Sequence, residues 1–227
     1  MTYIFSPAAP VALPVVGSDA LFPVRRVYCV GQNYAAHVAE MGGDGRTPPF
    51  FFSKPADALV PGGGRIAYPP RTDNLQHEVE LVVALRDGGS DITPEQALAC
   101  VFAHAVGIDL TRRDLQTRAK EKGQPWEMSK GFDQSGPISA LLPIGQSGHP
   151  ASGRIWLTVN GSVKQDGNLA QMTWNVAEII ANLSSYVALA AGDLIFTGTP
   201  AGVSTVVRGD VLKCGVEGVG ELTIELA

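Results

Sequence analysis

The segment NLQHEVELVVAL, residues 74–85, combines two glutamates with a long apolar run. Glu78 and Glu80 are two residues apart, so in a strand both side chains point to the same face, roughly 7 Å from each other. The positions that follow on that face and on the opposite face are all apolar. A strand that is apolar on both faces is typical of a protein core. The segment therefore predicts a buried strand over 79–85, with two neighbouring carboxylates at its start.

Composition limits the class of protein. The chain has 227 residues, of which 45% are hydrophobic and 17% charged, as in a folded globular protein. No apolar run approaches the ~20 residues that span a bilayer, and the N-terminal segment lacks the basic start and apolar stretch of a signal peptide. A net charge of −5 with scattered basic residues argues against nucleic acid or an anionic membrane as a partner. Cys29, Cys100 and Cys214 have no CxxC spacing, which indicates reduced thiols in a cytoplasmic protein.

Most other predicted elements are strands. VYCV (27–30) and VFAHAVGID (101–109) are typical of buried strands, and Asn160-Gly161 between two strand-like arms predicts a hairpin with a type I′ turn. Three short strands close the chain: DLIFTGTP, DVLKCGV and GELTIEL. Residues 1–24 are rich in proline, and we expect an extended N-terminal lead-in there, followed by a single domain over 25–227.

Predicted helices are fewer. Residues 33–41 have helical character, Thr93 should cap a helix that starts at Pro94, and Thr111 should cap another that Gly123 ends. The clearest helix is predicted over 175–189, because its apolar residues form one stripe: Val176, Ile179, Ile180, Leu183 and Val187. Many strands with a few short helices predict a β-rich α+β fold.

Asp109 ends the second buried strand as Glu78 opens the first. Two glutamates and an aspartate form an all-oxygen donor set, which suits a hard divalent ion, Mg²⁺ first and then Mn²⁺ or Ca²⁺. Zinc is disfavoured because no histidine or cysteine has ligand spacing. The alternative is a surface strand end with solvated glutamates, since an ExE pair occurs by chance in many proteins.

A second set of polar residues could carry acid–base chemistry. His37 and Glu40 are three residues apart and would share a helix face, where a carboxylate can fix the tautomer of a histidine base. An exposed helix with one histidine and one glutamate is the alternative. Lys130 lies in PWEMSKGFD, a segment without clear periodicity, and a single lysine is most often on the surface. His104, in mid-strand, is expected to be a hydrogen-bonded core histidine.

Taken together, these residues resemble the fumarylacetoacetate hydrolase family, and within it the short acylpyruvate hydrolase branch. The resemblance extends from about Arg25 to Ile224 and rests on a series of stretches in one order: VGQNYAAHVAEM, HEVELVVAL, GIDLTRRDLQ, KGQPWEMSKGFD, VNGSVKQDG and LIFTGTPAGV. It implies a mixed β-sandwich roll, a homodimer, and one catalytic domain over 25–227 with a Mg²⁺ or Mn²⁺ site.

The resemblance also implies roles for individual residues. Its metal ligands would be Glu78, Glu80 and Asp109, its water-activating dyad His37 and Glu40, and its substrate or enolate contacts Lys130, Gln116 and, for the substrate carboxylate, Thr199. One departure bears on substrate preference, because several relatives carry arginine where this chain has Gln32. The segments PPFFFSKPADA and QPWE favour the fumarylpyruvate hydrolases of aromatic-acid breakdown.

The expected activity is therefore metal-dependent cleavage of a carbon–carbon bond in an acylpyruvate, giving pyruvate and a carboxylic acid. Two alternatives stay open. The same metal–enolate chemistry serves β-keto-acid decarboxylases, of the oxaloacetate type, and isomerases or tautomerases of the family. A non-catalytic module could instead use a cation only to join strand ends. The acyl group is not specified by the sequence, and nothing ranks Arg25, Arg26, Arg46 and Arg71 as partners of a distal carboxylate.

Overall fold

The computed structural model describes residues 2–34 and 47–227. Its strands are β1 (Ala12–Val15), β2 (Ser18–Pro23), β3 (Arg26–Gly31), β4 (Phe50–Lys54), β5 (Leu59–Pro61), β6 (Gly64–Ile66), β7 (Leu75–Gln76), β8 (Val79–Leu85), β9 (Val101–Ile108), β10 (Thr111–Arg112), β11 (Gly136–Ile138), β12 (Leu142–Pro143), β13 (Arg154–Val159), β14 (Ser162–Asn168), β15 (Asp193–Phe196), β16 (Thr205–Val206), β17 (Val211–Val216) and β18 (Gly220–Leu226).

The helices are short and lie between the strands. They are α2 (Pro94–Ala97), α3 (Arg113–Glu121), α4 (Glu127–Lys130), α5 (Ile144–Ser147) and α6 (Val176–Tyr186), with 3₁₀ turns η1 (Ala56–Ala58), η2 (Leu98–Cys100) and η3 (Leu169–Gln171). No helix among the described residues is long and apolar enough to cross a membrane.

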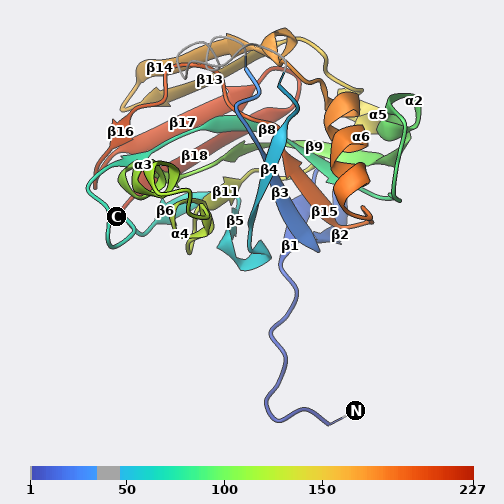
Figure 1. Ribbon diagram of the computed structural model, residues 1–227, viewed down its shortest axis with the longest axis horizontal. Coiled ribbons are helices and arrows are strands. Elements are labelled where there is room, and N and C mark those ends of the chain that lie inside the picture. The colour runs from blue at the N-terminus through green and yellow to red at the C-terminus, as the bar shows by residue number, and fades with distance from the viewer. Residues whose placement is uncertain (1, 35–46) are drawn as a thin grey trace.

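Two mixed sheets form the body of the molecule. In the described residues, an eight-stranded sheet has the order β4-β3-β15-β8-β9-β11-β5, with β12 beside β9, and a five-stranded sheet has the order β14-β13-β17-β18-β6. The five-stranded sheet covers one face of the larger sheet, with α2, α5 and α6 at one end and α3 and α4 at the other (Figure 1). This arrangement confirms the predicted β-rich sandwich roll.

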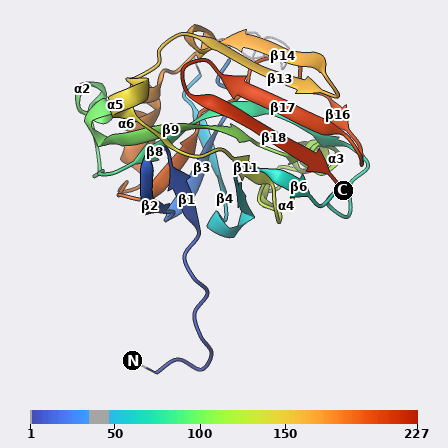
Figure 2. The same ribbon diagram turned by 180° about the vertical axis from the view of Figure 1, so that it is seen from behind.

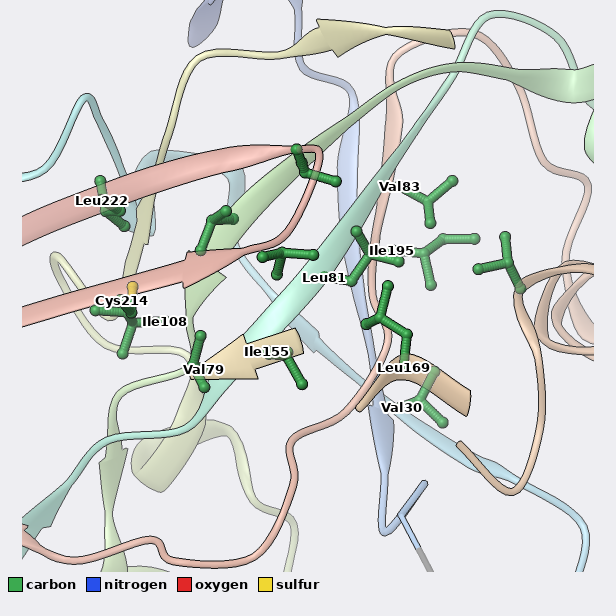
Figure 3. Close-up of a cluster of buried hydrophobic side chains, with 14 of the residues drawn as sticks. Val30, Val79, Leu81, Val83, Ile108, Ile155, Leu169, Ile195, Cys214 and Leu222 are labelled. Atoms are coloured by element: carbon green, nitrogen blue, oxygen red, sulfur yellow. The ribbon is translucent and has the colours of Figure 1, made fainter. Parts of the chain in front are cut away.

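Strand β8 is buried on both faces, as its sequence predicted. Leu81 and Val83 contribute to the main core between the two sheets, to which Ile155 and Leu222 of the five-stranded sheet also belong (Figure 3). Val82, on the opposite face of β8, belongs to a second apolar cluster. Successive side chains of β8 point alternately into the two apolar clusters. Both faces of the strand are therefore buried, which explains why its run of hydrophobic residues is continuous.

The N-terminal lead-in is more structured than predicted. Residues 12–23 form an antiparallel hairpin of β1 and β2, and its Leu13 and Phe22 fill the second apolar cluster together with Val82. Only the residues before β1 extend away from the body (Figures 1 and 2). The prolines of this segment do not prevent pairing, because a two-stranded hairpin leaves outward-facing positions where no N–H is needed.

Other local predictions are confirmed, with corrections at helix ends. Asn160 and Gly161 both have positive φ, +50° and +78°, as a type I′ turn requires. Helix α6 ends at Tyr186 and not at residue 189, because Val187 is extended. The prediction that Thr111 caps a helix is wrong: Thr111 is in β10, and its hydroxyl donates to the carbonyl of Asp109.

Candidate metal centre

Pairing of β8 with β9 brings the three acidic residues together. The strands are antiparallel, with Val79 opposite Ile108 and Glu80 opposite Gly107. The start of β8 therefore lies beside the end of β9, and the N–H of Asp109 donates to the carbonyl of Glu78 over 2.8 Å. Residues 31 positions apart in the chain become neighbours through this one register.

The three carboxylates form a compact, buried cluster. One oxygen from each of Glu78, Glu80 and Asp109 lies within 4.8 Å of the others, and the three residues are 6%, 1% and 0% exposed. The solvated strand end considered as an alternative is thereby excluded. Three buried anions at this spacing repel one another strongly, so the fold needs nearby positive charge to hold them ionised.

Two lysines supply part of that charge. The Nζ of Lys130, at the end of α4, lies 2.7 Å from Oε2 of Glu78 and 2.6 Å from Oδ2 of Asp109. The Nζ of Lys54, at the end of β4, lies 2.8 Å from the other oxygen of Asp109 and donates to the hydroxyl of Ser135 and the carbonyl of Lys130. Asp109 is thus held by a cation on each carboxylate oxygen.

Arg113, at the first turn of α3, is the third cation. Its guanidinium pairs with Oε1 of Glu78 and also donates to the side chains of Gln76 and Gln116. Burial raises the pKa of the Glu78 carboxyl, but Lys130 and Arg113 outweigh burial and hold that pKa below its usual range. Burial alone would lower the pKa of Lys130, yet Asp109 and Glu78 raise it above its ordinary value.

Glu80 is in the opposite situation. Burial, followed by the charges of Asp109 and Glu78, raises the pKa of Glu80 well above its usual range. Its Oε2 accepts a 2.7 Å hydrogen bond from the N–H of Gly198, but no lysine, arginine or histidine of residues 47–227 is within ion-pair distance of it. A buried carboxylate in this position takes up a proton or a metal ion. The donor set and its electrostatics therefore fit a hard divalent cation.

The predicted substrate contacts line the same small cavity as the carboxylates. Gln116, Lys130 and Thr199 all border it, together with Gln32 and Trp126. The hydroxyl of Thr199 already donates to the carbonyl of Val79 and accepts from Gln165. Its predicted role toward a substrate carboxylate thus requires that hydroxyl to exchange partners.

The other predicted residues fall elsewhere. His37, Glu40 and Arg46 lie outside the described residues. Arg25 and Arg26 pair with Asp193 at the start of β15, so their charges are already engaged.

Three contributors to the site were not predicted from the sequence: Lys54, Arg113 and the N–H of Gly198. Lys54 comes two residues after three phenylalanines, with Ser53 between, and a lysine this close to an apolar run is a weak local signal of burial. The sequence does not show which of the adjacent Arg112 and Arg113 reaches the carboxylates. In the structure it is Arg113, because Arg112 stacks on Phe132. Gly198 acts through its backbone, for which the side-chain sequence carries no signal.

A buried cluster of three carboxylates framed by three cations, at the strand ends of a β-sandwich roll, has the form of a metal-dependent active site. The fumarylacetoacetate (FAA) hydrolase C-terminal family matches residues 26–227, and the chain belongs to this family.

The chain is also similar to individual proteins and solved structures over most of its length. The chain is 44% identical to a fumarylpyruvate hydrolase of Ralstonia sp, over 77% of this chain and 91% of that protein. It is 40% identical to the mitochondrial oxaloacetate decarboxylase of Dictyostelium discoideum, over 86% of this chain and 90% of that protein. Among solved structures, the fumarylpyruvate hydrolase of Pseudomonas aeruginosa in complex with Mn²⁺ and pyruvate has a TM-score of 0.97 and 50% identity, covering 100% of this chain and 99% of that one.

Proposed function

We propose that this protein is a divalent-metal-dependent hydrolase that cleaves a carbon–carbon bond in acylpyruvates, with fumarylpyruvate as the favoured substrate. The observation that carries the proposal is the buried cluster of Glu78, Glu80 and Asp109, in a chain that is 50% identical to a fumarylpyruvate hydrolase whose structure contains Mn²⁺ and pyruvate. The products are pyruvate and the carboxylic acid of the acyl group.

In this proposal Glu78, Glu80 and Asp109 hold the metal, which supplies Lewis-acid polarisation of the substrate's keto oxygen when it is bound. Mg²⁺ is our choice of native ion, with Mn²⁺ and Ca²⁺ as candidates, because the donor set is entirely oxygen. Lys54 orients Asp109, and Arg113, which itself borders the cavity, orients Glu78, through the ion pairs described above.

The hydrolytic step needs a base and a place for negative charge. We assign His37, oriented by Glu40, to remove a proton from water, whose oxygen then bonds to the distal acyl carbon. The bond from that carbon to the pyruvyl methylene breaks, and its electron pair passes to the pyruvate enolate, which takes up a proton. The ammonium of Lys130, buried beside the carboxylates, is positioned to stabilise the enolate oxygen. Gln116 accepts from Arg113 through its amide oxygen, so its amide NH₂ is the group that we expect to contact substrate.

The competing activity is decarboxylation of a β-keto acid, which the similarity to the Dictyostelium oxaloacetate decarboxylase favours, or a tautomerase step at the same site. Neither reaction needs an activated water. Dependence on His37 therefore separates them from hydrolysis, since His37→Ala should abolish acylpyruvate cleavage and leave metal binding intact.

The direct test is a substrate panel with added Mg²⁺ or Mn²⁺: acetylpyruvate, fumarylpyruvate, fumarylacetoacetate and oxaloacetate, with both products quantified by chromatography. We expect fumarylpyruvate to give equal amounts of pyruvate and fumarate, at a higher kcat/KM than any other compound in the panel. If oxaloacetate is decarboxylated and no acylpyruvate is cleaved, the hydrolase assignment is wrong.

We also propose a homodimer acting in the cytoplasm on a small keto acid, within the breakdown of aromatic compounds, with no nucleic-acid or membrane partner. Cys29, Cys100 and Cys214 are free and buried, which is consistent with a reducing compartment. Light scattering on the purified protein measures the oligomeric state.

A further inference from the structure

One face of α3 borders the cavity along its length. Arg113, Gln116 and Lys120 all line it, at positions i, i+3 and i+7 of the helix, which fall on one side. Arg113 lies at the carboxylate cluster, and Lys120 is seven residues further on. Seven residues of helix rise about 10 Å, so the backbone of Lys120 lies about that far along α3 from Arg113, which pairs with Glu78.

Lys120 differs from Arg113 and Lys130 in having no anionic partner among the described residues. Arg113 and Lys130 are both committed to Glu78, and Lys130 also to Asp109. Within the described part of the chain, no carboxylate is within ion-pair distance of Lys120, whose Nζ lies 5.0 Å from the centroid of the Trp126 ring. Partial burial, and next the charge of Arg113, lower the pKa of Lys120 below its ordinary value. The negative charge of a carboxylate bound at Lys120 would offset both effects on that pKa.

The wall between Lys120 and the metal ligands is aromatic. Trp126 meets Phe50 edge to face, with ring centroids 5.2 Å apart, and lies 5.9 Å from Phe52. All three rings line the cavity. Flat rings of this kind suit a planar, conjugated acyl chain more than a branched one.

The spacing fits a keto acid that carries a carboxylate at each end. The seven-carbon chain of fumarylpyruvate has six carbon–carbon bonds of about 1.5 Å, and it spans roughly 7–8 Å when extended. With its keto-acid end at the carboxylate cluster, its far carboxylate would reach the level of Lys120.

We propose that Lys120 binds the distal carboxylate of the substrate, so that the site selects acylpyruvates whose acyl group ends in a carboxylate over those that end in an alkyl group. This inference rests on the proposed function for the identity of the keto-acid end. The sequence alone does not indicate which basic residue binds the distal carboxylate. The proposal gives this role to Lys120 and to none of Arg25, Arg26, Arg46 and Arg71.

The test uses two ligands that differ only in the distal carboxylate and cannot be hydrolysed: 2-oxoheptanedioate and 2-oxoheptanoate. Their affinities for the Mn²⁺-loaded protein are measured by calorimetry at low ionic strength, because salt screens an exposed charge. We expect the wild type to bind the diacid about 10- to 100-fold more tightly, the range for a hydrogen bond between charged groups. Lys120→Met should bind both ligands with the affinity of the monoacid, and Lys120→Arg should keep most of the preference.

Lys122→Met is the matched control, because Lys122 is an exposed lysine at the C-terminal end of α3 that does not border the cavity. It should behave as the wild type. In turnover, Lys120→Met should raise KM for fumarylpyruvate and leave KM for acetylpyruvate unchanged, with kcat little affected for both.

The inference is overturned if Lys120→Met keeps the preference for the diacid, or if the wild type has none. Failure of the proposed function has a different signature, in which no acylpyruvate is cleaved by the wild type whatever the calorimetry shows.

Discussion

Lys54 illustrates how a single buried side chain shapes the metal centre. Its ammonium is fully buried and pairs with Oδ1 of Asp109, while hydrogen bonds to Ser135 and to the carbonyl of Lys130 use its other donors. The same lysine therefore fixes the carboxylate of Asp109 and the end of α4. With Lys130 and Arg113, it brings three positive charges to Glu78 and Asp109, which leaves Glu80 without an ion-pair partner among the described residues.

His104 is a second buried titratable residue, and it lies in the middle of β9, five residues before Asp109. It is 0% exposed, its Nδ1 lies 3.1 Å from the hydroxyl of Ser147, and its Nε2 has no hydrogen-bond partner in residues 2–34 and 47–227. The expectation of a core histidine is confirmed, although only one of its two ring nitrogens is hydrogen-bonded. Burial, with a contribution from nearby His149, lowers the pKa of His104 from 6.5 to about 4.

This shift predicts a specific loss of stability in acid. Between pH 6.5 and 4 the unfolded chain binds a proton at residue 104 and the folded chain does not, so the free energy of unfolding decreases as the pH falls. Titration of His104 lowers the free energy of unfolding by about 2–3 kcal/mol between pH 7.5 and 4.5. Urea unfolding of the wild type and of His104→Gln over this range measures it as the difference between the two pH profiles.

His77, whose pKa burial also lowers, is present in both proteins and cancels in that difference. Parallel profiles for the wild type and His104→Gln would contradict the assignment. A profile for the variant that is flatter by the stated amount would support it.

At the level of secondary-structure elements, the turn after β15 contributes to the site together with the strands that carry the carboxylates. Gly198 has φ of +95° and donates its N–H to Glu80. A Cβ at this position would lie 2.8 Å from the Cβ of Asn33. Asn33 cannot easily move, because its amide donates to the carbonyls of Trp174 and Thr197.

Gly198→Ala should therefore weaken both the fold and metal binding. The left-handed conformation costs a residue with a Cβ about 1–2 kcal/mol, and the clash with Asn33 adds to this and displaces the donor to Glu80. Gly209 is a matched control, since its φ is +87° but no atom lies within 4 Å of an added Cβ. Gly209→Ala should lower the free energy of unfolding only by the cost of the left-handed backbone conformation, and its Mn²⁺ affinity should be unchanged.

Urea unfolding and Mn²⁺ titration of both variants make the comparison. Equal Mn²⁺ affinities for Gly198→Ala and the wild type would show that the hydrogen bond from the turn is not needed to orient Glu80.

The elements also show what local sequence could predict. β8, β9 and the β13–β14 hairpin follow from hydrophobic patterns and turn residues, which act over a few positions. The start of α3 was misplaced at Thr111 because the capping signature is also compatible with a short strand, and pairing of β10 with β7 decides between them. The end of α6 was placed three residues too late, since its apolar stripe continues into an extended segment.

At the scale of the whole molecule, three acidic residues could be grouped from the sequence because each lies at the end of a buried strand. Two of their cations could not, since Lys54 and Arg113 come from separate elements whose packing is a long-range property of the fold, whereas Lys130 was named only through the family resemblance. The N-terminal hairpin escaped prediction for a similar reason: its Leu13 and Phe22 become core residues only against the outer face of β8. Roles for His37 and Glu40, and the single-domain organisation, stay predictions.

The most direct test of the metal centre is Mn²⁺ binding by the wild type and by Glu80→Gln, which keeps the size of the side chain and removes its charge. We predict one Mn²⁺ per chain for the wild type, which at 100 times its Kd stabilises the fold by about 2.7 kcal/mol. Glu80→Gln should bind Mn²⁺ about tenfold more weakly or worse, and it should gain correspondingly less stability. A variant that binds Mn²⁺ as tightly as the wild type, or a wild type that binds none, would contradict the assignment of these three carboxylates.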